Sequence, residues 1–225
     1  MAFNRLALVL GNCLFPDHNQ LTPTNKTLFF MAEDSGLCTH FKYHKHKLVL
    51  FLSAMRSHAD IVREQHELEY YKLSKDNQHE SYEDKLKKTL KKHPEIEEFV
   101  TYDIEDHFFE NRIRQFCKEA DIKLTVVNSP GFITTKEDFA EYNRSTKKPF
   151  MQVFYKNQRK GLGILMEPDG SSPINGKWSF DEDNRKKLPK GIQIPEIPTP
   201  QSTQHTGDVK KLVDELFPNH PGSTE

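Results

Sequence analysis

The chain has 225 residues, of which 35% are hydrophobic and 29% charged, and this composition suits a globular domain on the polar side. Its length provides for one sizeable domain, or for one domain with an arm. The formal net charge of −1 excludes a global basic field that attracts nucleic acid, so any contact with DNA requires a local patch or another domain.

The first 130 residues alternate between strand-like and helix-like patterns. Residues 6–10 are a continuous apolar run that ends at Gly11, which predicts a strand buried on both faces, as in a parallel sheet. The alternation predicts βαβ units with right-handed crossovers, and therefore an α/β fold. We expect a Rossmann-like three-layer sandwich with a mostly parallel five-stranded sheet, followed by helices and a Pro-rich linker. The predicted strands are 6–10, 27–31, 69–73, 98–102 and 123–127, and the predicted helices carry apolar stripes over 48–62, 82–90 and 109–120.

The pattern changes after Pro130. Short helices are predicted over residues 136–142 and 150–161. Four prolines between residues 189 and 205 predict a semi-extended linker. A last amphipathic helix over 209–216, at the end of this linker, has little of its own to pack on, so we expect it to begin a longer helical region. The predicted domain organisation is an α/β domain over 1–130, a helical and turn-rich extension over 131–188, the linker over 189–205 and the last helix within 206–225.

The three cysteines, Cys13, Cys38 and Cys117, do not form a local metal site, because no two of them lie at metal-ligand spacing. An odd number of cysteines without a secretory signal favours reduced thiols in the cytoplasm. No apolar stretch approaches the roughly 20 residues that span a bilayer. We therefore expect a cytoplasmic protein without membrane contact.

The carboxyl ends of the first two predicted strands are the first candidates for a ligand site, because open α/β sheets bind ligands at this edge. Gly11, Asn12, Cys13 and Leu14 follow the first strand, and Glu33 follows the second. The alternative interpretation is a plain turn with a buried cysteine, and a Glu33 that caps a turn or faces water. The chain contains neither a dinucleotide-binding G-x-G-x-x-G motif nor a P-loop.

A dense cluster of histidine, lysine and aromatic residues over 40–47 precedes the long helix. Helix N-termini attract phosphate-like groups, so His44 and Lys45 are predicted to contact a ligand or another domain. The alternative is a solvated loop. The histidine spacings are interrupted by lysines, which disfavours a metal site.

Two further segments are rich in basic residues. The bases and aromatics over 147–160 suit a nucleic-acid or an interdomain contact. Alternatively, the aromatics dock this helix on the α/β body while the bases, Arg159 among them, stay in water. We expect the lysines of the second helix to form a solvated face rather than a nucleic-acid patch; they are Lys85, Lys87, Lys88, Lys91 and Lys92.

The only tryptophan, Trp178, lies in a charged segment that is too polar for a core element. Its ring is expected to pack and to pin this segment against the body of the protein. Asp181, Asn184 and Arg185 then serve structural roles, with Arg185 paired to Asp181 or Asp183. The alternative is direct contact with a partner, because exposed aromatic and arginine groups are typical of interfaces.

The string W-x-F-D-x-x-N-R-K-x-L-P over residues 178–189 resembles the photolyase-related proteins of the photolyase/cryptochrome superfamily, in its bacterial iron–sulfur branch. Further pieces occur in the family's order and together cover essentially the whole chain. They are 10–12, 44–47 with 52–56, 139–142, 154–155 with Arg159, 163–166, 176–186 and 217–220.

This resemblance implies the antenna domain of a light-driven DNA-repair flavoprotein, which holds a lumazine-type chromophore. FAD, a 4Fe-4S cluster and most of the site for damaged DNA would lie in a helical C-terminal domain, of which only the first helix is present here. That domain would be the partner of this chain, in cis or in trans. The chain, as a truncated form or a shortened natural protein, would then not repair DNA alone. The candidate cofactor-binding residues are Gly11, Asn12, Cys13, Leu14, Glu33, His44 and Lys45.

Two positions depart from the family pattern. Members have Gly-Asp-Gln-Leu where this chain has Gly11-Asn12-Cys13-Leu14, and an acidic residue where it has Leu37. Both changes remove groups that hydrogen-bond a polar heterocycle.

Two other classes of function fit the sequence. One is a stand-alone binding module of the same fold without a chromophore, which acts through its linker arm. The other is a small α/β protein that binds, or acts on, a nucleotide-like ligand. No catalytic triad, carboxylate pair or nucleophile elbow is recognisable from spacing, so enzymatic activity stays open.

Overall fold

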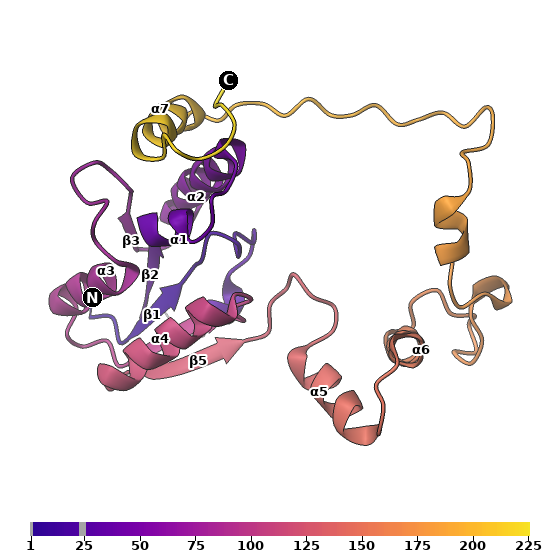
Figure 1. The fold of residues 1–225 in the computed structure, drawn as a ribbon. Coiled ribbons are helices and arrows are strands. Elements are labelled where there is room, and N and C mark those ends of the chain that lie inside the picture. The colour runs from indigo at the N-terminus through magenta and orange to yellow at the C-terminus, as the bar shows by residue number, and fades with distance from the viewer. Residues whose placement is uncertain (1, 23–25) are drawn as a thin grey trace. The chain divides into compact units, whose positions relative to one another are not determined.

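The computed structural model describes residues 2–22 and 26–225 and divides into two compact units. Unit 1 comprises Met1–Gly131 and Pro200–Glu225, and unit 2 comprises Phe132–Thr199. Figure 1 shows the elements of both. Over the described residues, no helix combines the length and the apolar character needed to cross a membrane.

The described part of unit 1 contains one parallel sheet of five strands, in the order β3-β2-β1-β4-β5. In register, Leu6 lies opposite Leu28 on one side and opposite Phe99 on the other. The chain moves outward from β1 to β3, then returns to the other side of β1, so the strand order reverses between β1 and β4. The predicted Rossmann-like α/β fold is confirmed. The strands are β1 (Arg5–Leu8), β2 (Thr27–Ala32), β3 (Leu68–Tyr71), β4 (Glu98–Tyr102) and β5 (Lys123–Val127).

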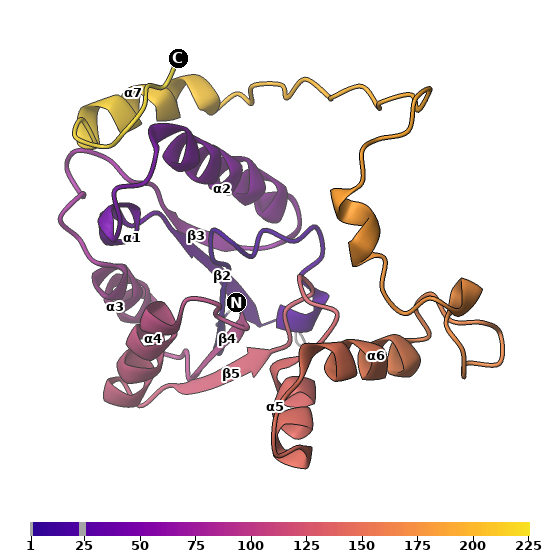
Figure 2. The same ribbon diagram turned by 45° about the vertical axis from the view of Figure 1, so that its right-hand side comes forward.

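Helices cover both faces of this sheet (Figure 2). Each predicted helix of this region is present, and Ser81 and Asp84 begin one of them with a capping box. A five-residue helix, α1, was not predicted, because it is too short to show a period. The helices of the α/β region are α1 (Ser35–Thr39), α2 (Lys45–Gln65), α3 (Tyr82–Lys92) and α4 (His107–Glu119).

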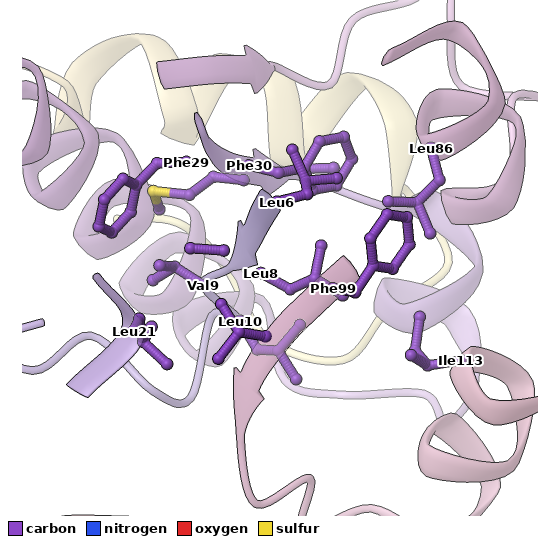
Figure 3. Packing of buried hydrophobic residues seen from close by; sticks show 14 of the residues in the cluster. Leu6, Leu8, Val9, Leu10, Leu21, Phe29, Phe30, Leu86, Phe99 and Ile113 are labelled. Atoms are coloured by element: carbon purple, nitrogen blue, oxygen red, sulfur yellow. The ribbon is translucent and has the colours of Figure 1, made fainter. Parts of the chain in front are cut away.

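The core of unit 1 lies on both faces of the sheet because side chains alternate along each strand. Figure 3 shows Leu6, Phe30 and Phe99 directed towards α3 and α4, while Phe29 lies towards Leu21. All five side chains are fully buried. The alternation thus secures helices on both faces and fixes the positions of the loops at the strand ends.

The last helix, α7 (Thr206–Leu216), packs along α2, as Figures 1 and 2 agree. Val209, Val213 and Phe217 form an apolar cluster with Leu48 and Leu52 of α2. The expectation that this helix has little to pack on is therefore wrong. Its partner lies far upstream in the chain rather than in the linker.

Unit 2 contains α5 (Lys136–Ser145) and α6 (Met151–Leu162), close to the predicted ranges. Thr135 and Asp138 form a capping box at α5. The hydroxyl of Tyr142 donates to the carbonyl of Phe150, and its oxygen accepts from the Phe150 N–H, both at 3.0 Å. These local bonds join the two helices.

Arg159 of α6 is buried, so the interpretation in which the bases of this helix stay in water is wrong for this residue. It donates to the carbonyl of Trp178 at 2.7 Å and to that of Lys177 at 3.2 Å. Its guanidinium also lies 5.4 Å from the centre of the half-buried Trp178 ring. The tryptophan segment is thus pinned to α6 within unit 2. The side chain of Asp183 lies outside the described residues, so its pairing with Arg185 stays a prediction.

Candidate functional site

An open cleft of about 220 Å³ lies at the carboxyl ends of β1, β2 and β4. Doubly wound sheets bind ligands at this edge, where the strand order reverses. The loops after these three strands line the cleft, together with residues of α1, α2, α3 and α4. The cleft is therefore at the edge of the sheet that the sequence indicated.

The walls of the cleft are mostly apolar, with aromatic side chains among them. Phe51 of α2 and Phe108 of α4 line it, and Leu37 contributes an aliphatic surface. The ring of Tyr43 also lines it, with the ammonium of Lys47 4.2 Å from the ring centre. Such walls suit a flat, largely apolar ring system with a few polar substituents.

Of the four predicted residues after β1, Gly11 and Asn12 line the cleft, whereas Cys13 and Leu14 do not. Gly11 lines it, and a Cβ at this position would lie 2.8 Å from Sδ of Met55, so glycine permits the close approach of the loop to α2. Asn12 also lines the cleft, and its exposed amide donates to Glu105 at 3.5 Å. Cys13 is buried and Leu14 is half-buried, and both pack in the main core. Burial, with Glu105 and Asp103 nearby, raises the pKa of the Cys13 thiol to about 12.

Glu33 also lies at the cleft, but its carboxylate is occupied by groups of the protein. Arg56 donates to both oxygens, at 2.8 and 2.9 Å. The hydroxyl of Tyr70 donates to Oε1 at 2.5 Å, and the N–H of Leu73 donates to Oε2 at 2.7 Å. The side chain therefore fixes α2 and the segment after β3 to the end of β2. We assign it a positioning role in the wall.

His44 and Lys45 do not line the cleft; they begin α2 and contact the C-terminal end of unit 1. The His44 ring accepts from the N–H of His46 as the N-cap of α2. Lys45 pairs with Asp214 at 2.6 Å. Both residues were predicted to contact a ligand or another domain. In the structure they contact the segment around α7 and do not line the cleft.

Lys85 is fully buried, so its assignment to the solvated face of the second helix is wrong. Its ammonium donates to the carbonyls of Glu33 and Glu80, both at 2.9 Å. Burial lowers the pKa of Lys85, against the opposing effect of Asp34. A signal was present in the sequence, since Tyr82, Lys85 and Leu86 share one helical face. The other four lysines of this helix are exposed.

Asp34 and Tyr82 also line the cleft and were not predicted as site residues. Oδ1 of Asp34 accepts from the N–H of Leu37 at 2.8 Å, while Oδ2 lies 3.9 Å from the ammonium of Lys85. Neither Oδ2 nor the Tyr82 hydroxyl has a hydrogen-bond partner among the described residues. Burial, with Asp34 nearby, raises the pKa of Tyr82. Buried polar groups with spare hydrogen-bonding capacity therefore lie beside a mostly apolar cleft.

A second hollow, of about 240 Å³, lies between the loop after β1 and the end of α2. The buried rings of His18 and His58 meet here, with 2.7 Å between their Nε2 atoms. Burial, with His58 and His66 nearby, lowers the pKa of His18 to about 4. Across residues 2–22 and 26–225, no three His, Cys, Asp or Glu side chains are grouped so as to hold a metal ion.

Comparison with known proteins identifies a family model and one relative that match nearly the whole chain, and a second relative that matches part of it. The family model for deoxyribodipyrimidine photo-lyase-related protein matches residues 7–225. The chain is 24% identical to the (6-4) photolyase of Agrobacterium fabrum over 225 residues, which are 99% of this chain and 44% of that protein. It is 41% identical to uncharacterized protein R852 of Acanthamoeba polyphaga mimivirus over 93 residues, or 40% of this chain and 46% of that one. The chain thus matches less than half the length of these two relatives.

Proposed function

The chain belongs to the family of deoxyribodipyrimidine photo-lyase-related proteins, and we propose that unit 1 is a light-harvesting domain. It would bind a flat heterocyclic chromophore of the lumazine type in the cleft at the strand ends. The observation that carries this proposal is the position of an aromatic-walled cleft at the reversal point of the sheet.

The residues of the cleft fit such a group. Phe51 and Phe108 offer aromatic surfaces for a planar ring, and Leu37 excludes water from one side. The amide of Asn12 and the ammonium of Lys47 provide donors for carbonyl or hydroxyl groups of a heterocycle and its side chain. The two positions that depart from the family pattern leave this cleft with fewer acidic groups, so aromatic and apolar contacts would contribute most of the affinity.

The chromophore, when bound, absorbs near-ultraviolet or blue light and supplies the excitation. The protein orients the ring and shields it from water. We propose that the excitation passes to a flavin in a helical domain that also carries a 4Fe-4S cluster and contacts damaged DNA. DNA repair is then an activity of that assembly, in cis or in trans, and not of residues 1–225 alone.

Absorption and fluorescence titration of the purified chain with a ribityl-lumazine, and separately with FMN, tests this function. We expect saturable binding of the lumazine with a shifted absorption band. Phe51→Ala should weaken binding at least about fivefold, because an aromatic contact contributes about 1 kcal/mol beyond its buried area.

Leu50→Ala is the matched control, because this neighbouring residue of α2 is 65% exposed and does not line the cleft. It should leave the affinity unchanged. Equal effects of the two variants would refute the cleft assignment. A wild-type chain that binds neither compound would refute the light-harvesting role, and binding of a nucleotide without a chromophore would support a nucleotide-binding protein instead.

A further inference from the structure

The C-terminal segment, Pro200–Glu225, belongs to unit 1 although the whole of unit 2 precedes it in the chain. Its helix α7 lies along α2 in both ribbon views (Figures 1 and 2). Val209 and Val213 are fully buried and Phe217 is 2% exposed. This apolar contact shows that the segment is seated on the α/β domain rather than extended into solvent.

The surface of α2 on which the segment packs also forms one wall of the cleft. Leu48 and Leu52 of α2 belong to the apolar cluster that contains Val213, and both line the cleft. Cys38 and Tyr43 pack against the same cluster and line the cleft as well. A displacement of α7 therefore removes support from the side chains that shape the cleft.

Polar contacts fix the loop before α2 in the same way. The imidazole Nδ1 of His220 lies 2.9 Å from the carbonyl oxygen of Tyr43, whose ring is at the cleft. The first N–H of α2, that of Lys45, donates to the carbonyl of Pro221 at 2.9 Å. Helix N-termini leave such N–H groups without intrahelical partners, so the segment satisfies a donor that α2 cannot satisfy itself.

Gly222 allows this contact. Its φ is +83°, and a Cβ at this position would lie 2.0 Å from Nε2 of His44. A residue with a side chain would therefore both strain the backbone and collide with the ring that caps α2. Side-chain contacts add to these along the segment, at 2.6 Å between His205 and Asp60 and at 2.6 Å between Lys45 and Asp214.

We propose that the C-terminal segment is a positioning element of the ligand cleft, so that ligand binding and docking of the segment stabilise each other. This inference rests on the function proposed above, because it assigns regulation to that same cleft. Coupling between two binding events is reciprocal. An occupied cleft holds α2 and Tyr43 in the arrangement that receives the segment, and a docked segment holds the cleft ready for its ligand.

Gly222→Ala tests the proposal, because Gly222 lies outside the cleft and the substitution acts on docking. We expect the affinity for the ribityl-lumazine to fall about fivefold, the low end of typical coupling between sites. Gly191→Ala is the matched control: its φ is +89°, but no atom lies within 4 Å of the added Cβ. It carries similar backbone strain and should leave the affinity unchanged. Val213→Ala, which loosens α7 through its buried face, should act in the direction of Gly222→Ala.

A second measurement does not depend on the ligand. Cys38 lies between the cleft and the seat of α7, whereas Cys13 and Cys117 are buried in the main core. Maleimide labelling resolved by mass spectrometry should be faster at Cys38 in Gly222→Ala and unchanged at the other two thiols. Saturating lumazine should slow labelling of Cys38 and hydrogen exchange of residues 206–216 in the wild-type chain.

The two proposals can fail separately. If the amides of 206–216 exchange faster in Gly222→Ala while lumazine affinity and Cys38 labelling stay at wild-type values, the segment does not position the cleft. If the wild-type chain binds no chromophore but Cys38 still responds to Gly222→Ala, the light-harvesting role fails while the support of the cleft wall by the segment stands.

Discussion

Apolar side chains from the strands and from the helices on both faces fill the interior of unit 1, whereas a buried guanidinium, that of Arg159, joins segments of unit 2. Phe30 and Phe99 are fully buried in unit 1. In unit 2, Arg159 is 3% exposed and donates to the carbonyls of Ile164, Leu165, Lys177 and Trp178. Unit 1 is held mainly by apolar burial, whereas in unit 2 hydrogen bonds that converge on one side chain join α6 to the segment over 164–178.

Unit 2 also leaves much of its apolar surface uncovered. Ile133 is 71% exposed, Met151 73% and Ile197 90%. The hydrophobic effect acts on the area removed from water, so it contributes less to unit 2 than to unit 1. We therefore expect unit 2 to open at a lower free energy than unit 1. Trp178, the only tryptophan, lies in unit 2, so its fluorescence reports on that unit alone.

The largest expected effect comes from a substitution in the core of unit 1. Phe99→Ala should lower the free energy of unfolding of unit 1 by about 4 kcal/mol, because it removes a fully buried ring that stacks on Phe116. Urea unfolding followed by hydrogen exchange of the strand amides measures this loss. The Trp178 emission transition should keep its midpoint. Phe139→Ala, at a position in unit 2 that is 47% exposed, is the control and should leave the strand amides unchanged.

A joint shift of the Trp178 transition and the strand amides in Phe99→Ala would contradict the comparison. It would show that the two units unfold together, and that apolar burial in unit 1 also sustains unit 2.

The second largest effect is expected from a substitution that destabilises unit 2 and leaves unit 1 unchanged. Arg159→Met keeps an unbranched apolar side chain in place of the arginine stem but removes every hydrogen bond to the four carbonyls. We expect the free energy of unfolding of unit 2 to fall by about 3 kcal/mol, because the carbonyl partners of a buried charged group are left without a donor. A red shift of Trp178 emission and faster exchange of the amides of 164–178 measure this loss, while the strand amides of unit 1 stay protected.

Lys160→Met is the matched control for Arg159→Met. Lys160 is the next residue of α6, it is exposed, and its ammonium also lies 5.4 Å from the Trp178 ring centre. It removes a positive charge near the ring without removing a hydrogen bond to a carbonyl. If both variants shift the emission equally, charge near the ring, and not the carbonyl bonds, holds the segment.

The difference between the units also explains what the sequence could predict. β4 and β5 have the predicted bounds, and the stripe of α2 was recognisable, because apolar burial leaves a period in the sequence. The hydrogen bonds of Arg159 leave no such period. They go to backbone carbonyls, which every residue has, so the sequence offered for Arg159 only a contact with a partner or a place in water.

The candidate site shows the same limit. The position of Gly11 at a strand end was sufficient to predict the edge of the sheet that carries the cleft. Lys85 shares a helical face with Tyr82 and Leu86, which indicates burial, but the carbonyl of Glu33 that accepts from its ammonium lies far away in sequence. The contact of the C-terminal segment with α2 could not be predicted either, because the spacing of apolar residues in two amphipathic helices does not show that they pack on each other.

The smallest expected effect is a dependence of stability on pH, and it should differ between the units because they differ in histidine content. All 11 histidines lie outside residues 132–199. Burial holds the pKa of His18 at about 4, below its ordinary value of 6.5, so the unfolded chain takes up a proton at a pH where the folded chain does not. The stability that neutral His18 contributes is complete above about pH 6.5 and falls as the pH is lowered towards 4. The expected loss in unit 1 is on the order of 2 kcal/mol.

Urea unfolding at a series of pH values measures this loss through the strand amides. His18→Gln should reduce the slope of stability against pH without abolishing it, because burial also lowers the pKa of His58 and His66. The Trp178 transition should stay flat over the histidine range, since unit 2 has no group that titrates there by this mechanism. A wild-type slope in His18→Gln, or an equal slope in the Trp178 transition, would mean that the acid sensitivity arises elsewhere than in the buried imidazoles of unit 1.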